Sequence, residues 1–143
     1  MDFASIRIIT DDLDRLVEFY EKVTGVPAER PAPVFAEFVL PSATVAIGHS
    51  QTVQLFGADS ARAADNHSVI IEFRVDDVDA ECARLKPLVD DWVQEPTTMP
   101  WGNRSILFRD PDGNLVNLFT PVSEEAIERF SSRAPAIAPA PAG

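Results

Sequence analysis

The chain opens with an alternation of hydrophobic and polar residues that predicts a strand over residues 3–10. Ile6 and Ile8 alternate with Ser5 and Arg7, and a period of two is that of a strand with one buried side. The period then lengthens to that of a helix, and its apolar positions are Leu13, Leu16, Val17 and Tyr20. The Asp11-Asp12 pair can cap this helix, and Gly25 is a natural stop.

The same order of patterns returns in the second half of the chain. Ser68 to Val75 alternates again and predicts a strand. Asp76-Asp77-Val78-Asp79 then matches Asp11-Asp12-Leu13-Asp14, 65 residues earlier, and a second helix follows. The inward positions of this helix are Val78, Cys82 and Leu85, and Pro87 disturbs its end.

Extended segments fill the rest of each half. A short extended piece follows Pro27, and further strands are predicted at residues 34–40, 43–49 and 92–95. Residues 53–56 could form a short strand, whereas the small and polar residues from 57 to 66 read as a connection between the halves.

The last two strands, at about 104–109 and 114–120, are joined by the turn Asp110-Pro111-Asp112-Gly113-Asn114. Pro111 fixes φ as the second position of a type I turn requires, and Asp110 can accept hydrogen bonds from the backbone ahead of it. Gly113 supplies a positive φ. The pattern therefore predicts a β-hairpin at this point.

Two similar halves are thus predicted, each with a strand, a helix and three more strands. We expect a first module at 1–50, a connecting segment at 51–67 and a second module at 68–122. Ser123 caps a short helix within 123–133, and the Ala- and Pro-rich residues 134–143 are expected to be disordered.

Composition narrows the class of protein. The chain has 143 residues, of which 45% are hydrophobic, and a formal net charge of −11. This charge excludes a basic footprint for nucleic acid and disfavours anionic membranes. Neither a signal peptide nor an apolar run of about 20 residues is present, so a cytoplasmic protein is expected. Cys82, the single cysteine, cannot form an internal disulfide.

The repeated pattern with Asp-Pro-Asp-Gly-Asn in the last hairpin resembles the vicinal oxygen chelate superfamily, which includes glyoxalases, bleomycin resistance proteins and extradiol dioxygenases. The resemblance extends from Phe3 to Pro121, and Trp101-Gly102 with Arg104 is most similar to the bleomycin resistance group. It implies an α+β fold in which two tandem βαβββ modules form a curled, mostly antiparallel sheet. The concave cleft of that sheet would hold a small ligand.

The resemblance also implies where a metal would bind. Metal-using members place ligands at equivalent strand positions, which fall on Ser5, Ile70 and Asn117 and near Ala46. His, Gln or Glu would be expected there, whereas these four side chains offer no strong donor. We therefore predict no metal and no other cofactor. If a metal were nevertheless required, His49, His67 and Glu72 would be the candidate ligands.

If these positions face the cleft, the period of two predicts the other side chains beside them. The predicted lining is Ser5, Arg7, Ile70, Glu72, Arg74, Leu115, Asn117 and Phe119. The charged members have two interpretations. Glu72 could form an internal ion pair with Arg7 or Arg74, or a spare arginine could bind an anionic or carbonyl-bearing ligand. Glu72 could also act as a general base.

Three aromatic side chains complete the candidate site. Trp101, beside Gly102 and just before a strand, could stack on a planar ligand, contact a partner chain or fill its own core. Phe38 and Phe56 are further candidate ligand contacts.

The leading hypothesis is a metal-free protein that sequesters a planar or aromatic compound, as a homodimer. The alternative is a lyase, isomerase, cyclase or dioxygenase, either metal-dependent with displaced ligands or metal-free with Glu72 as its base. A structural partner without a small ligand, its cavity plugged by Trp101 and Phe119, is a third interpretation.

Overall fold

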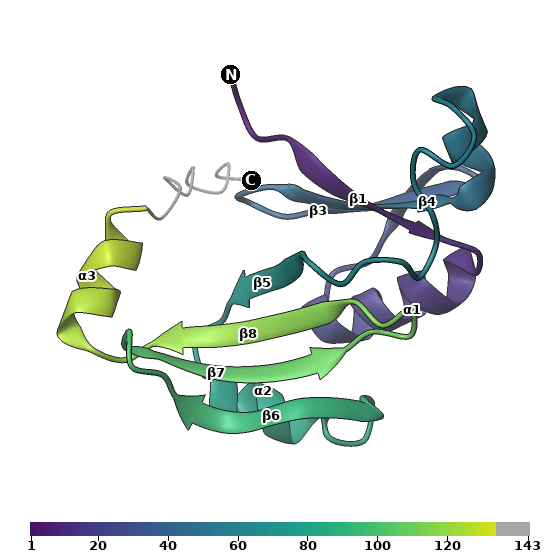
Figure 1. The fold of residues 1–143 in the computed structure, drawn as a ribbon. Helices are drawn as coiled ribbons and strands as arrows, with labels where there is room; N and C mark the ends of the chain where they lie inside the picture. Colours follow the sequence, from purple (N-terminus) through teal and green to yellow (C-terminus); the bar gives the residue numbers. More distant parts are fainter. Residues whose placement is uncertain (134–143) are drawn as a thin grey trace, which may run out of the picture.

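The computed structural model describes residues 1–133, and each half of this part forms a strand, a helix and three strands (Figure 1). The first module comprises β1 (Ser5–Thr10), α1 (Leu13–Thr24), β2 (Glu29–Ala32), β3 (Phe35–Val39) and β4 (Thr44–His49). The second comprises β5 (Ile70–Arg74), α2 (Val78–Leu85), β6 (Asp91–Thr98), β7 (Asn103–Arg109) and β8 (Leu115–Pro121). A 3-10 helix η1 (Ser50–Leu55) follows the first module, and α3 (Glu124–Ser131) follows the second.

Each module forms its own four-stranded mixed sheet. The strand orders are β1-β4-β3-β2 and β5-β8-β7-β6, so β1 and β5 are equivalent edge strands. Both pair in parallel with the last strand of their module, while the other neighbours are antiparallel. The two βαβββ modules are confirmed. The described residues form two separate sheets, however, instead of the one continuous curled sheet that was expected.

The registers of the two sheets are equivalent residue by residue. Ser5 pairs with Thr44 and Arg7 with Ala46, while Ile70 pairs with Leu115 and Glu72 with Asn117. Ser5 therefore corresponds to Ile70, and Ala46 to Asn117, as the sequence comparison of the halves assumed.

The two module helices start with the same cap. The side chains of Asp12 and Asp77 accept hydrogen bonds from the backbone N–H groups of Arg15 and Ala80, at 3.2 and 3.1 Å. α1 ends where Gly25 adopts a left-handed conformation with φ 69°. No helix among residues 1–133 has the length and apolar character needed to span a membrane.

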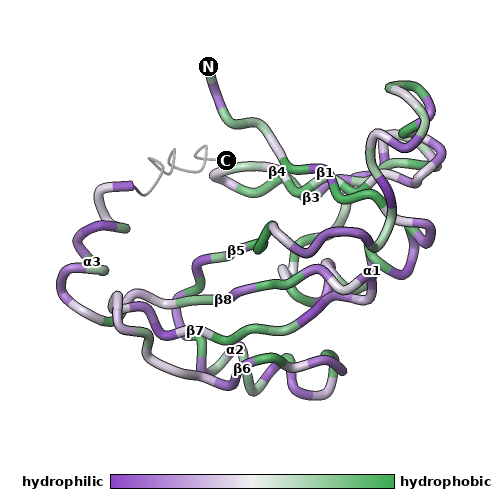
Figure 2. Tube along the Cα trace, viewed as in Figure 1, coloured by the Kyte–Doolittle hydropathy of each residue, from purple (hydrophilic) through white to green (hydrophobic). Residues whose placement is uncertain are grey.

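One hydrophobic core connects both modules. It joins the apolar faces of α1 and α2 to one side of each sheet, and its largest fully buried side chains include Tyr20, Phe38 and Phe108. In Figure 2 a hydrophobic stretch runs through the middle of β7, whereas α3 is mainly hydrophilic. Because both helix-facing sides belong to this core, the other side of each sheet points away from it. We call these two sides the open faces.

Several local predictions need correction. Residues 53–56 do not form a strand, because Val53 is buried within η1 and the chain turns there with i→i+3 backbone bonds such as Phe56 N–H to Val53 O. The strand expected at 92–95 extends over β6 with bulges in its pairing to β7. The expected disorder of residues 134–143 lies outside the described residues.

Candidate functional site

The Asp110–Asn114 turn ties the two modules and their connection together. Asp110 is 4% exposed, and its carboxylate accepts bonds from the Tyr20 hydroxyl at 2.7 Å and the Asn114 amide at 2.8 Å. The backbone N–H groups of Asp112 and Asn114 donate to its other oxygen, at 2.9 Å each. Asn66 donates in turn to the Asn114 side chain at 3.1 Å. The motif therefore positions α1 and the connecting segment, and the Asp110 carboxylate is fully engaged within the protein.

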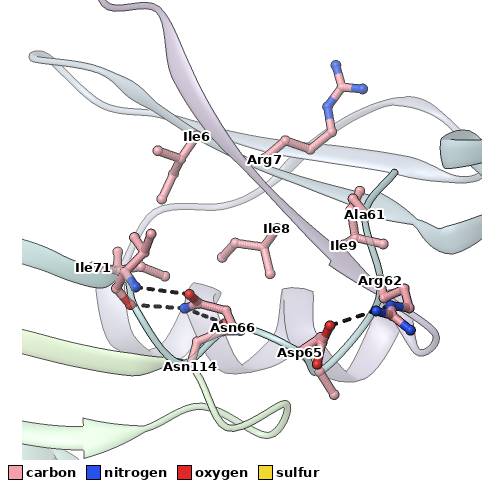
Figure 3. A pocket seen from close by; sticks show the side chains of 12 residues that line it. Ile6, Arg7, Ile8, Ile9, Ala61, Arg62, Asp65, Asn66, Ile71 and Asn114 are labelled. Carbon is pink, nitrogen blue, oxygen red and sulfur yellow. Dashed lines mark hydrogen bonds and ion pairs between the residues drawn. The ribbon is translucent and has the colours of Figure 1, made fainter. Parts of the chain in front are cut away.

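A pocket of about 390 Å³ lies between the two edge strands (Figure 3). Ile6 and Ile8 project into it from β1, while Arg7 extends to the other side of the strand. The polar side chains at its rim are engaged with one another, since Arg62 pairs with Asp65 at 3.5 Å and Asn66 bonds Asn114. This pocket is mainly an aliphatic gap between the modules.

A larger groove of about 960 Å³ follows the free edge of β5. All residues from Val69 to Val75 line it, together with the start of β1, the turn between β3 and β4, and parts of β7, β8 and α3. Aromatic side chains gather at the α3 end: Trp101 is 58% exposed, and Phe119 and Phe130 lie 5.1 Å apart between ring centroids. This groove is the candidate site.

Polar groups occupy the open face beside the groove. The Asn117 amide donates to the Glu72 carboxylate at 2.7 Å. Asn117 Oδ1 is buried and has no hydrogen-bond partner in the described chain, and the same holds for Oδ1 of Asn103, which is 6% exposed. A buried acceptor without a donor is costly, so these oxygens are suited to a ligand or water that donates a hydrogen bond.

The internal ion pair that the sequence allowed does not form within residues 1–133. Arg74 donates to the backbone carbonyl of Phe130 at 3.0 Å, and Glu72 is held by Asn117 instead. Arg7 lies on the other sheet, where its guanidinium carbon is 5.1 Å from the ring centroid of Phe35 and 5.5 Å from that of Phe56. Arg104 pairs with Asp79 at 2.7 Å, on the helix-facing side.

The structure thus divides the predicted site residues between separate places. One group borders the groove or its open face: Ile70, Glu72, Arg74, Trp101, Asn117 and Phe119. A second group, Ser5, Arg7 and Phe56, lies on or over the open face of the first sheet. Phe38 is fully buried against Tyr20 in the core, with ring centroids 6.3 Å apart, so we omit it from the site. Trp101 is too exposed to fill its own core.

Sequence reasoning missed the contribution of α3. The sequence predicted this helix but assigned none of its residues to the site, yet Phe130 and Arg129 line the groove. The cap at Ser123 was predicted, and its side chain accepts from Ala126 N–H at 3.1 Å. The apolar positions Ala126, Ile127 and Phe130 have the spacing of a helix face, which is the signal that could have placed α3 against a sheet.

The residues at the family metal positions do not fit a metal. Ser5 and Ala46 lie on one sheet and Ile70 and Asn117 on the other, and together they offer one hydroxyl and one amide. Nowhere in residues 1–133 do three or more His, Cys, Asp or Glu side chains form a group that could hold a metal ion. His49, His67 and Glu72 are therefore not assembled as an alternative ligand set. The acceptor pattern of the groove suits hydrogen-bond donors better than a cation that needs several strong ligands.

Solved structures with the same fold are similar to this chain over most of its length. A glyoxalase/bleomycin resistance protein/dioxygenase from Nocardioides is 22% identical, with 87% of this chain and 85% of that chain covered and a TM-score of 0.72. A family enzyme from Burkholderia phytofirmans PsJN is 17% identical, with 85% and 100% covered and a TM-score of 0.75. A glyoxalase-related enzyme from Fulvimarina pelagi is 18% identical, with 84% and 88% covered and a TM-score of 0.72.

At these identities the structures establish the fold alone. No curated protein has significant sequence similarity to this chain. Residues 2–118, however, match the sequence profile of the Glyoxalase/Bleomycin resistance protein/Dioxygenase superfamily, which covers most of the chain. The chain belongs to the glyoxalase/bleomycin resistance protein/dioxygenase superfamily.

Proposed function

We propose that this protein binds and sequesters a planar or aromatic small molecule in the groove along β5, without a metal at the family positions. The observation that carries the proposal is the gathering of Trp101, Phe119 and Phe130 at one end of a groove of about 960 Å³. Sites for small ligands usually have volumes of about 300–1,000 Å³ and combine apolar surface with a few polar groups.

The groove offers both parts of such a site. Trp101 presents an exposed indole at its mouth, and an aromatic ring is stabilised by stacking as well as by loss of apolar surface to water. Glu72 and Asn103 line the groove and supply polar groups that can orient a ligand. Members of other functional classes share this fold, so the proposal depends on these side chains and not on the family.

We also propose a homodimer. Large apolar side chains are exposed over both open faces: Leu55 is 87% exposed, Phe56 73% and Ile70 48%. Exposed apolar surface on two sides of a chain is typical of an association site, and a twofold dimer is the commonest assembly. Sedimentation equilibrium checks this directly, because a monomer at micromolar concentration would exclude it.

The binding proposal is tested by titrating planar aromatic compounds into the protein by calorimetry. A ligand should bind with one site per chain and raise the melting temperature, since binding to the native state alone stabilises it by mass action. Trp101→Ala should weaken binding about tenfold or more, because it removes the stacking surface. Leu88→Ala removes another exposed apolar side chain that does not line the groove, and it should leave the affinity unchanged.

Equal losses in both variants, or no effect of Trp101→Ala on a compound that binds, would place the ligand elsewhere. Failure of every planar compound to bind would overturn the proposal.

A second candidate function is an isomerase or cyclase in which Glu72 acts as a general base. The observation that favours it is the bond from Asn117, which orients the Glu72 carboxylate on the open face at 2.7 Å. A substrate converted by this route should no longer be turned over by Glu72→Gln, although that variant should still bind it. Unchanged turnover in Glu72→Gln would exclude Glu72 as the base.

A further inference from the structure

Three arginines gather at the α3 end of the groove. Arg74 from β5 and Arg129 and Arg133 from α3 and its end all line it. The chain has 23 acidic residues against 12 basic ones, so this concentration of positive charge runs against its composition. Glu81 and Arg84 also line the groove, but they form an ion pair with each other.

None of the three arginines has a carboxylate partner within residues 1–133. Arg74 is bonded to the Phe130 carbonyl at 3.0 Å, and the guanidinium carbon of Arg129 lies 4.9 Å from the Phe130 ring centroid. Glu72, on the same strand as Arg74, accepts a hydrogen bond from Asn117 at 2.7 Å. Because a guanidinium has five N–H donors, Arg74 keeps N–H groups from which a planar oxyanion could accept hydrogen bonds.

The same face presents acceptors without donors. Asn103, at the start of β7, lines the groove, whereas Asn117 lies on the same sheet outside the groove lining. Their Oδ1 atoms are buried without a partner in the described residues. These oxygens require N–H or O–H donors, which a carboxylate cannot supply.

We infer that the ligand of this groove is an aromatic acid whose ring also carries an N–H or O–H donor. The carboxylate lies among the arginines, the ring lies against Trp101 and Phe130, and the donor faces Asn103 Oδ1. This inference rests on the proposed function, because it names the chemical class of ligand for the same groove. Guanidinium groups recognise carboxylates through paired, charge-assisted hydrogen bonds, which gives the site its selectivity.

Three probes with one ring system test the charge requirement. Hydroxynaphthoate supplies the ring, the hydroxyl and the anion; hydroxynaphthamide keeps the ring and hydroxyl but is neutral; naphthylmethylamine is a cation. Calorimetry should show hydroxynaphthoate binding at least about tenfold more tightly than the amide, which is the ratio expected from one charge-assisted contact. Added salt should weaken the binding of hydroxynaphthoate and leave the binding of the neutral amide unchanged.

Substitution of single arginines tests whether those of the groove bind the carboxylate. Arg74→Gln should reduce the carboxylate-to-amide ratio to near one. Arg15→Gln is the matched control, since Arg15 on α1 is exposed and lies outside the groove, and it should keep the ratio. Arg74 also holds α3 through the Phe130 carbonyl. If that structural role were its only one, both ligands would lose affinity equally and the ratio would not change.

The outcomes separate this inference from the proposed function. If the amide or the amine binds as tightly as the acid, the ligand is not selected as an anion and only this inference falls. An equal loss of selectivity in Arg15→Gln would show a general effect of net charge and would overturn it too. If none of the three probes binds, the groove does not accept aromatic ligands of this size, and the proposed function falls as well.

Discussion

Removal of the Tyr20 hydroxyl is expected to destabilise the fold by about 2 kcal/mol. Tyr20 is fully buried, and its hydroxyl donates to the Asp110 carboxylate at 2.7 Å. Tyr20→Phe keeps the ring and creates no cavity of consequence. A hydrogen bond to a charged group contributes about 1.5–3 kcal/mol. Because three other donors still hold this carboxylate, the loss should remain below the 3–5 kcal/mol typical of breaking a buried ion pair.

Urea denaturation of wild type and Tyr20→Phe measures this difference, and the dependence on urea should be the same for both. Ser50→Ala is the matched control. It also removes a hydroxyl that donates to a carboxylate, that of Asp11, but the bond is exposed. Its effect should stay within about 0.5 kcal/mol. Equal, small losses in the two variants would refute the idea that burial gives the Tyr20 bond its strength.

The same residue provides an independent optical test. Tyr20 is the only tyrosine, so tyrosinate absorbance reports on it alone. Burial, followed by the neighbouring Asp110 carboxylate, raises the pKa of Tyr20 well above its ordinary value of 10.0. Folded protein should therefore show no tyrosinate where urea-unfolded protein already does. Because the folded state retains the proton, this contribution to stability is complete below the ordinary pKa and declines as the pH rises above it. The difference in free energy of unfolding between wild type and Tyr20→Phe should therefore shrink as the pH rises above that ordinary value.

Two further predictions concern the turns that frame the site. Gly102 has φ 92°, and a Cβ there would collide with the Ser123 side chain, whereas Gly25 has open space at φ 69°. Gly102→Ala should therefore lower the free energy of unfolding by several times the ~1 kcal/mol expected for Gly25→Ala. Urea denaturation measures both losses, and equal losses would contradict this prediction. Burial raises the pKa of the Asp112 carboxyl above 3.8, so this group favours folding at acidic pH and loses that contribution as the pH rises through the raised value. Asp112→Asn should be at least as stable as wild type at neutral pH. A less stable variant would show that burial is not the dominant cause of the raised pKa.

Local chemistry in the sequence was sufficient for the elements and their order. The period of two around Ile6 and Ile8 predicted β1, and the Asp12 and Asp77 side chains cap the helices that the spacing of apolar residues indicated. Asp110 and Gly113 form the expected turn, with Gly113 N–H donating to Asp110 O at 3.0 Å. These features depend on neighbours within a few residues, so they can be read from the chain directly.

The candidate site depended on contacts between distant segments, which no local pattern contains. Alternation placed Glu72 and Asn117 correctly on one face, but it could not show that Arg74 would bond the Phe130 carbonyl, 56 residues away, instead of Glu72. Phe38 follows a strand period that fits either face, and only packing against Tyr20 assigned it to the core.

The sequence therefore determined the repeated modules, the caps, the hairpin turn and the lack of metal donors at the family positions, because each is a matter of residue type and short-range spacing. The tertiary structure decided which open face each side chain joins, that α3 lines one end of the groove, and that three arginines line the groove there. Those relations arise because burying the common core brings remote segments together, and the energy of that burial is shared by the whole chain.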